Sequence, residues 1–225
     1  MIRLRSCFEI QGGIRFLSHL DILKLIERSL RRAAIPVEFS QGFNPHPKIA
    51  FGPARPVGLA SLCEYFDVEL KEPLDPEDFR IRLQEKFPAD IKIRETVVVP
   101  LHAKALTAVL NCAIYEVELE NSLACSKEEL QGRVEKLLDR KEIVICRHSP
   151  KGKKEVDIRP GIWGIFLSIH PDSIIMKMEV MIGEGVNTKP GEVIQSMGFN
   201  SKDIIGITRT GLFIREADGR KSNPL

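Results

Sequence analysis

The chain lacks several features that would assign it to a specialised class. No apolar run approaches the roughly eighteen residues of a membrane-spanning helix, and residues 1–5 lead directly into a predicted strand without the apolar core of a signal peptide. We therefore expect a cytoplasmic protein with no membrane partner. Neither a Walker loop nor a dinucleotide-binding fingerprint is present, so the sequence predicts no nucleotide cofactor.

Cysteine is sparse and widely spaced. No C-x-x-C pair occurs, and the odd number of cysteines argues against a zinc ribbon, an iron–sulfur run or a disulfide framework, so we expect neither a metal nor a cofactor. Three cysteines stand within apolar runs that are typical of strands, which predicts small buried side chains there: Cys7, Cys112 and Cys146. The other two are Cys63 and Cys125.

What remains is a globular composition with an uneven charge. The 225 residues, 43% of them apolar and 28% charged, suffice for one large domain or two of about a hundred residues. Residues 1–60 carry nine Lys or Arg against four Asp or Glu, a net charge of +5, whereas residues 61–110 carry seven against ten. The small overall charge of +2 therefore hides a basic first segment that could attract phosphate.

Hydrophobic periodicity predicts the same order of elements twice, β-α-β-β-α-β, with extra strands inserted the second time. In the first half, strands are expected at 2–10, 47–53, 62–70 and 91–99, and helices at 18–34 and 76–87. In the second half, strands are expected at 113–120, 142–147, 154–158, 163–169, 173–181 and 204–214, and helices at 127–139 and 190–197. This order predicts an α+β protein of two tandem ferredoxin-like domains, residues 1–105 and 106–225.

The helix expected at 18–34 belongs to the most informative segment, residues 12–66. Ser18 and Asp21 form a capping box, and an apolar face is predicted from Leu20, Leu23, Ile26 and Leu30. Capping does not explain a histidine at the first helical position, where free backbone N–H groups favour an anion. The candidate anion-binding residues in and beside this helix are Arg15, His19, Arg28, Arg31 and Arg32.

A rigid loop follows this helix. In residues 39–48 two prolines alternate with polar and aromatic residues, and Gly42 permits a turn. An aromatic ring, an amide, an imidazole and an ammonium group within six residues could recognise a nucleobase and its phosphate, which makes candidates of Phe43, Asn44, His46 and Lys48. Arg55 is a further binding candidate, and Glu64 could act as a general base with His19 or His46.

These residues also carry a family resemblance. The segments that carry it are Gly13 to Asp21, the Glu27-Arg28 and Arg31-Arg32 pairs, Phe39 to Pro47, Gly58 to Ser61, Lys154 to Arg159, Lys189 to Ile194 and Thr208 to Leu212. They resemble the radical SAM-linked protein family, a domain of unknown function that is encoded beside, or fused to, a B12-binding-type radical SAM protein. The resemblance implies a radical SAM enzyme as partner. Because the chain has no C-x-x-x-C-x-x-C, it would be the separate accessory subunit.

Three functional hypotheses follow. The first is a non-catalytic accessory protein that presents RNA, or another anionic substrate, to the radical SAM enzyme. The second, by analogy of fold, is a metal-independent endoribonuclease that uses His19 or His46. The third is a scaffold that only docks the partner enzyme. They differ in whether His19, Asn44, His46, Arg55 and Glu64 line one concave surface.

Overall fold

The computed structural model is an α+β fold and describes residues 1–225 except 121–125, 150–151, 171–172 and 184. The chain divides into two compact units, of which the first comprises residues 1–110 and 214–225 and the second comprises residues 111–213. The final segment, which the sequence placed with the second half, thus groups with the first unit. No helix among the described residues is long and apolar enough to cross a membrane.

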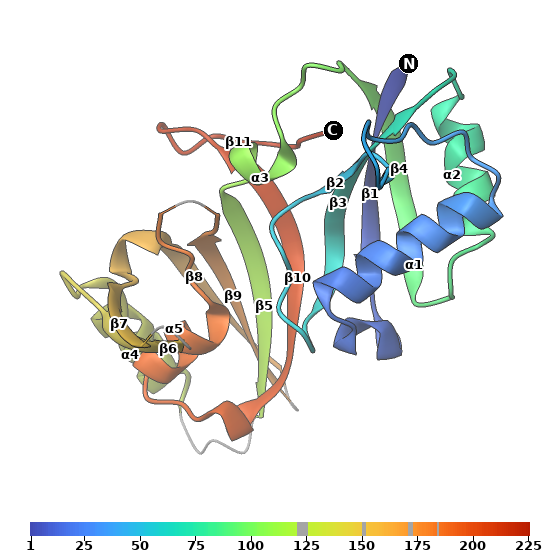
Figure 1. The fold of residues 1–225 in the computed structure, drawn as a ribbon. Helices are drawn as coiled ribbons and strands as arrows, with labels where there is room; N and C mark the ends of the chain where they lie inside the picture. Colours follow the sequence, from blue (N-terminus) through green and yellow to red (C-terminus); the bar gives the residue numbers. More distant parts are fainter. Residues whose placement is uncertain (121–125, 150–151, 171–172, 184) are drawn as a thin grey trace. The chain divides into compact units, whose positions relative to one another are not determined.

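The first unit is an antiparallel sheet with two helices on one face (Figure 1). Its elements are β1 (Ile2–Ile10), the 3-10 helix η1 (Gly12–Phe16), α1 (His19–Arg32), β2 (Ile49–Phe51), β3 (Ala60–Leu70), α2 (Pro76–Gln84), β4 (Ile91–Val99), α3 (Leu106–Val109) and β11 (Lys221–Ser222). The strand order is β4-β1-β3-β2. The last two residues of β10 (Ile204–Arg215), which belong to this unit, pair with β11. The sequence predicted no helix at the position of α3.

The core of the first unit lies between this sheet and its helices. Phe8 and Phe66 of β1 and β3 meet edge to face, and α1 places Ile22, Ile26 and Leu30 against them. The predicted apolar face was therefore wrong in part, because Leu20 is 65% exposed. Two residues turn a helix by about 200°, so a helix that buries Ile22 must point Leu20 outward.

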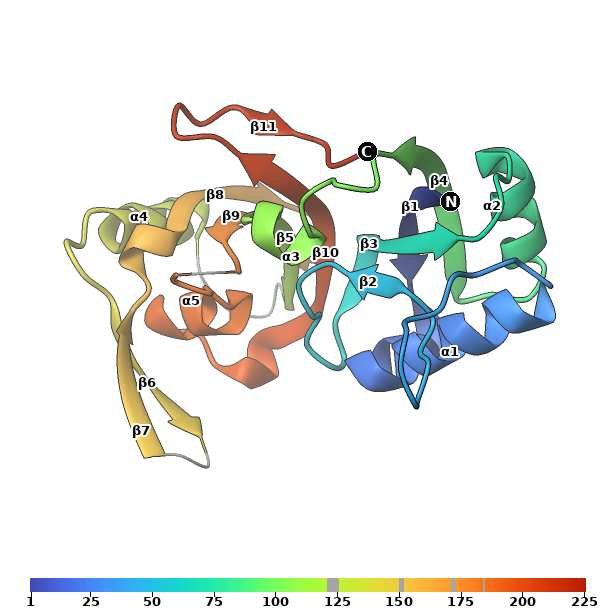
Figure 2. The ribbon, with the colours of Figure 1, turned by 45° about the horizontal axis from the view of Figure 1, so that its top comes forward.

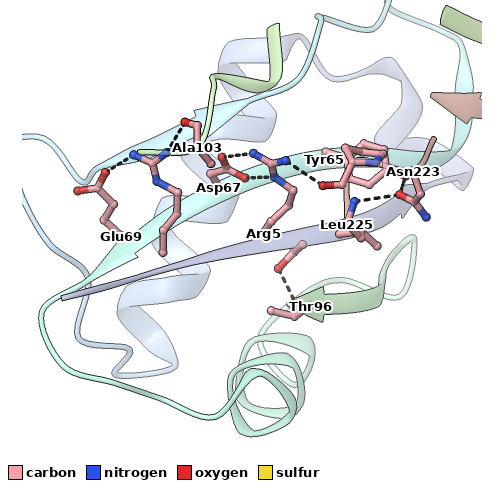
Figure 3. Close-up of polar contacts among 11 residues, drawn as sticks. Arg5, Tyr65, Asp67, Glu69, Thr96, Ala103, Asn223 and Leu225 are labelled. Carbon is pink, nitrogen blue, oxygen red and sulfur yellow. Dashed lines mark hydrogen bonds and ion pairs between the residues drawn. The ribbon is translucent and has the colours of Figure 1, made fainter. Parts of the chain in front are cut away.

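The opposite face of this sheet is charged yet largely buried. Arg5 of β1 donates two hydrogen bonds, of 2.7 and 2.9 Å, to the carboxylate of Asp67 on β3, and a third to the carbonyl of Pro224 (Figure 3). One register step away, Arg3 pairs with Glu69 at 2.7 Å. The C-terminal segment covers the first pair, so both of its side chains are about 5% exposed.

Further along the same face, Cys7 and Tyr65 lie opposite each other on β1 and β3. Burial raises the pKa of the Cys7 thiol to about 11, an effect that its hydrogen bond with Tyr65 only partly offsets. Burial likewise raises the pKa of the Tyr65 hydroxyl, which donates to Asn223 at 3.3 Å. Both groups are therefore neutral at physiological pH, and Cys7 is not a reactive thiol.

The second unit repeats the order with a hairpin inserted. Its elements are β5 (Cys112–Glu120), α4 (Lys127–Leu138), β6 (Val144–Ser149), β7 (Gly152–Asp157), β8 (Ile162–Ile169), β9 (Ser173–Met181), α5 (Pro190–Ser196) and β10 (Ile204–Arg215), with 3-10 turns η2 (Arg159–Gly161) and η3 (Ser201–Asp203). The antiparallel sheet has the order β10-β5-β9-β8. Strands β6 and β7 pair only with each other and project from the unit (Figure 2).

The projecting hairpin explains one wrong expectation. Cys7 and Cys112 are buried, as predicted for strand residues, but Cys146 is exposed. No described residue of β6 or β7 is fully buried, so an apolar run in this two-stranded sheet does not imply a core position. Cys63 is buried, and Cys125 lies outside the described residues.

The buried Arg5–Asp67 pair gives a stability prediction. Asp67→Asn should destabilise the protein by about 3–5 kcal/mol, because it leaves the Arg5 guanidinium buried without its counter-charge. Urea unfolding followed by circular dichroism measures the change. Glu77→Gln, which breaks the exposed Glu77–Arg80 pair, is the control and should leave the unfolding midpoint where it is. Equal midpoints for both variants would contradict this account.

Candidate functional site

Helix α1 is positioned by its cap and by its apolar stripe. The Ser18 hydroxyl accepts a hydrogen bond from the Asp21 N–H at 3.2 Å and donates one to the Asp21 carboxylate at 2.6 Å, which confirms the predicted capping interaction. The hydrogen bonds that the Asp21 carboxylate accepts from the side chain and the backbone of Ser18 hold its pKa below the usual range, with a smaller contribution from Lys24. With Ile22 and Ile26 on the sheet, the basic residues of the helix face outward.

Three of these cations line one groove. Lys24, Arg28 and Arg32 stand four residues apart, so successive members lie about 6 Å apart along the axis on one side of the helix. They face the turn between α2 and β4 across a groove of ≈ 620 Å³ that also contains Lys86. Its apolar lining comes from Leu17, Leu25, Phe87 and Pro88, and its one acidic side chain is Asp21. We call this the basic groove.

The far wall of the basic groove is tied to the helix. The carbonyl of Lys86 accepts hydrogen bonds from the Ser29 hydroxyl at 3.3 Å and from Arg32 at 3.1 Å. The Lys86 ammonium lies 3.4 Å from Glu85, whereas Lys24 and Arg28 make no ion pair within the described part of the chain. The groove therefore offers two unpaired cations in a fixed setting.

The loop that follows α1 is a narrow hairpin. Phe39 and Pro47 form a bridge, Ser40 N–H donates to the His46 carbonyl at 2.8 Å, and His46 N–H donates to the Ser40 hydroxyl at 3.0 Å. The tip then displays its side chains to solvent, Phe43 completely and Asn44 and His46 substantially. The loop is thus held by hydrogen bonds across its base and has the aromatic ring of Phe43 at its tip.

Lys48 at the base of this hairpin has a structural partner. Its ammonium lies 3.1 Å from Glu69, which also accepts the hydrogen bond from Arg3. That hydrogen bond is the main cause of the lowered pKa of Glu69, and Lys48 adds to it. Lys48 therefore helps to fix the hairpin to β3 and is not a free phosphate ligand.

A small pocket at the start of α1 brings together three other candidates, His19, Arg55 and Glu64. Its cavity is only ≈ 20 Å³, room for about one water molecule. The imidazole of His19 packs edge to face on Phe51, with ring centroids 5.3 Å apart. Glu64 is 7% exposed, as expected for an inward position on β3.

Arg55 in this pocket holds two loops together. Its guanidinium donates to the carbonyls of Arg15 at 2.8 Å, of Pro56 at 2.9 Å and of Leu17 at 3.3 Å, and also to that of Leu59. The segment before α1 is thereby fixed to the loop before β3. Arg55, a binding candidate in the sequence, is 8% exposed, and its guanidinium makes these contacts within the protein.

The predicted site residues thus separate into distinct places. His19, Arg55 and Glu64 share the small pocket, whereas His46 is on the hairpin and does not line it. Arg28 and Arg32 share the basic groove, and Arg31 lies on the other side of α1. Arg15 is exposed over the ring of Phe16. Among the described residues, no group of three or more His, Cys, Asp or Glu side chains could hold a metal ion.

The sequence-based prediction omitted two cations of the basic groove, Lys24 and Lys86. Lys24 was recognisable from its four-residue spacing before Arg28 and Arg32. Lys86 was not recognisable, because only the tertiary packing of the α2–β4 turn brings it to α1.

Comparison with known proteins identifies the family. A family model described as "Uncharacterized protein conserved in bacteria (DUF2344)" matches residues 3–190. The chain belongs to this family. No curated protein matches the chain. Since nothing in these comparisons links DUF2344 to radical SAM proteins, that link stays a prediction.

Among solved structures, the chain is similar to one in the "Crystal Structure of a Cbf5-Nop10-Gar1 Complex", with a TM-score of 0.53 and 11% identity over 94% of this chain and 50% of that one. It is also similar to a chain of the archaeal box H/ACA sRNP Nop10-Cbf5 complex, with a TM-score of 0.47 and 10% identity over 92% and 46% of the two chains. The chain spans about half the length of these proteins. At such identities the likeness shows the fold alone.

The Arg55 brace can be tested by a conservative substitution. Arg55→Lys should destabilise the protein by about 2–4 kcal/mol, because one ammonium cannot reach the several carbonyls that the planar guanidinium satisfies. Urea unfolding measures the loss. Arg15→Lys, in an exposed side chain of the same segment, should have no measurable effect. If Arg55→Lys also left the free energy of unfolding unchanged, the carbonyl contacts would not stabilise the fold.

Proposed function

We propose that this protein is a non-catalytic accessory subunit that binds single-stranded RNA, or another phosphate-bearing polyanion, through the basic groove. The observation that carries the proposal is the row of Lys24, Arg28 and Arg32 opposite Lys86, with one carboxylate at its end. A spacing of about 6 Å between successive cations suits the successive phosphates of a single strand. Lys24 and Arg28 can bind them without first breaking an ion pair, whereas Lys86 would exchange its contact with Glu85.

The partner in this proposal is a radical SAM enzyme. The support for it is the sequence resemblance carried by the segments around His19, Phe43 and Arg159, and the absence of a cluster-binding C-x-x-x-C-x-x-C from the chain. The accessory subunit would hold the anionic substrate while the partner performs the reaction.

We also propose that both units are ferredoxin-like domains. The order of elements, β1-α1-β2-β3-α2-β4 in the first unit and β5-α4-β8-β9-α5-β10 in the second, supports this assignment. So do the strand orders, in which the last strand borders the first and the first borders the third in each unit. The β6–β7 hairpin would be an insertion in the second domain.

Endonuclease chemistry has less support from the geometry. An acid and a base must both reach the scissile phosphate, and of the two histidines only His19 lines the pocket of Glu64. A cavity of ≈ 20 Å³ does not admit a nucleotide. We therefore assign His19 and Glu64 a structural role.

A docking role for the same unit is supported by an exposed apolar surface. Phe16, Leu20 and Val57 are 59%, 65% and 60% exposed, and all three lie at the start of α1 or in the loop that Arg55 fixes to it. Such side chains on a braced loop are typical of a protein contact. We propose this surface, the apolar patch, for the partner enzyme.

The basic groove predicts a salt-dependent affinity. Fluorescence anisotropy with an eight-nucleotide single-stranded RNA, measured over a range of salt concentrations, should give a log–log slope that falls in magnitude by about 0.7 for each of Lys24→Ala and Arg28→Ala. The loss should be similar for every RNA sequence, because phosphate contacts carry no sequence information.

Lys92→Ala is the matched control for this measurement. Lys92 is an exposed lysine of the same unit that does not line the groove, and its removal changes the net charge equally. An unchanged slope in the groove variants, or an equal change in the Lys92→Ala protein, would contradict the proposed function.

The apolar patch predicts a separate loss. Leu20→Ser and Val57→Ser should abolish co-purification with the radical SAM enzyme while leaving RNA affinity within about twofold, because both residues are outside the basic groove and neither change alters the charge. Leu20 is 65% exposed, so Leu20→Ser should still fold. Ile81→Ser, at an exposed apolar position of α2, is the control. Retained co-purification in both patch variants would exclude this docking surface.

A further inference from the structure

A second cavity lies on the other side of α1, between this helix and the hairpin of residues 37–47. Its volume is ≈ 250 Å³. Apolar side chains form most of its lining: Leu30, Ile35, Pro36, Val37, Phe39 and Pro47. We call it the hairpin pocket. None of the functions proposed above uses it.

The walls of the hairpin pocket are held by backbone hydrogen bonds. Val37 bridges to Leu70 and Phe39 bridges to Pro47. Between them, Glu38 N–H donates to the carbonyl of Glu69 at 2.8 Å, and its own carbonyl accepts from Lys48 N–H at the same distance. Proline at positions 36 and 47 restricts the backbone further. The pocket is therefore preformed, and a ligand would lose little free energy in ordering it.

Two cationic residues also line this apolar pocket. Arg31 contributes to the lining from α1, and the ammonium of Lys71 lies 5.7 Å from the centre of the Phe39 ring. Glu27 is the one acidic side chain in the lining, so the charged groups sum to +1. Arg31 makes no ion pair within the described residues, which leaves it available to an anionic ligand.

The size and chemistry of the hairpin pocket select the kind of ligand. At ≈ 250 Å³ it is smaller than typical drug-sized sites of about 300–1,000 Å³, so it takes one ring system and not a polymer. An aromatic wall, two proline rings and a cationic rim suit a flat base that carries a phosphate.

The pocket also adjoins the proposed RNA path. Arg28 and Arg32 belong to the basic groove, and Arg31 belongs to the hairpin pocket, yet all three lie within five consecutive positions of α1. A strand that leaves the groove across the exposed side of the helix would therefore meet Arg31 before it reaches the pocket.

We propose that the hairpin pocket receives one unstacked base of the same single-stranded RNA whose phosphates lie in the basic groove. This inference rests on the proposed function and adds a base-binding position to it. The phosphate beside that base contacts Arg31 and Lys71, while the ring packs against Phe39 and Pro47.

The test compares two RNAs with equal numbers of phosphates. One is an eight-adenosine strand, and the other is the same strand with every base removed. Phe39→Ala should weaken binding of the eight-adenosine strand by about 5- to 100-fold, the range for loss of one base–aromatic contact. It should leave the abasic strand unaffected. Arg28→Ala should weaken both strands by the same factor.

Two further variants control for misfolding and for the loss of an aromatic ring outside the pocket. Phe39→Leu keeps most of the side-chain volume and removes only the ring, so it should reproduce the selective loss if Phe39→Ala is poorly folded. Phe16→Ala removes an exposed aromatic ring outside the pocket and should change neither affinity.

The outcomes separate the inference from the proposed function. If the Phe39 variants affect both strands equally, or neither strand, the base pocket is wrong while the basic groove stands. If Phe43→Ala causes the selective loss instead, the base binds at the hairpin tip and the pocket is again wrong. If Arg28→Ala changes neither affinity, the proposed function itself fails.

Discussion

The packing of α1 on the sheet is the constraint on which both proposed binding places depend. Ile22, Ile26 and Leu30 are at most 3% exposed, and each buried aliphatic side chain contributes about 1.5–3 kcal/mol. Their burial fixes the rotation of the helix about its axis. Once that rotation is set, Lys24, Arg28 and Arg32 must face the α2–β4 turn, and Arg31 must face the hairpin. If α1 were rotated differently about its axis, these cations would line neither the basic groove nor the hairpin pocket. The position of the charged side chains therefore follows from the burial of the apolar ones.

The two loops beside α1 are fixed by opposite means. The hairpin of residues 37–47 is joined to the sheet by its own backbone hydrogen bonds, with Lys48 and Glu69 as an added ion pair. In the segment before α1 a side chain contributes most directly: Arg55 donates to the carbonyls of Arg15 and Leu17, and the Gly58 N–H adds a second hydrogen bond to the Arg15 carbonyl. A buried guanidinium is costly to desolvate, so it is retained where several acceptors converge on it. Rigidity on both sides of the helix is what a preformed binding surface requires.

Much of the fold could be predicted from sequence, because local signals determine it. The Ser18 cap, the Asp75-Pro76 helix start and the alternation of Tyr115, Val117 and Leu119 each specify an element without reference to the rest of the chain. The candidate site was harder to predict from the sequence. Arg55 and Arg28 are chemically alike in the sequence, and only tertiary structure shows that one is buried among carbonyls while the other is exposed. Lys86 and Lys71 come from distant turns, so no periodicity could associate them with α1.

The net charge of +5 in residues 1–60 overstates the basic surface, because the acidic stretch that follows neutralises part of it. Arg3, Arg5 and Lys48 pair with Glu69 and Asp67 of β3, and Arg55 is buried among backbone carbonyls. The remaining five cations of this segment are Arg15, Lys24, Arg28, Arg31 and Arg32, and four of them belong to α1. Exposed charge is therefore concentrated on one helix. Since electrostatic attraction falls off within about 10 Å at ordinary salt, such a concentration attracts a polyanion more effectively than the same charge spread over the unit.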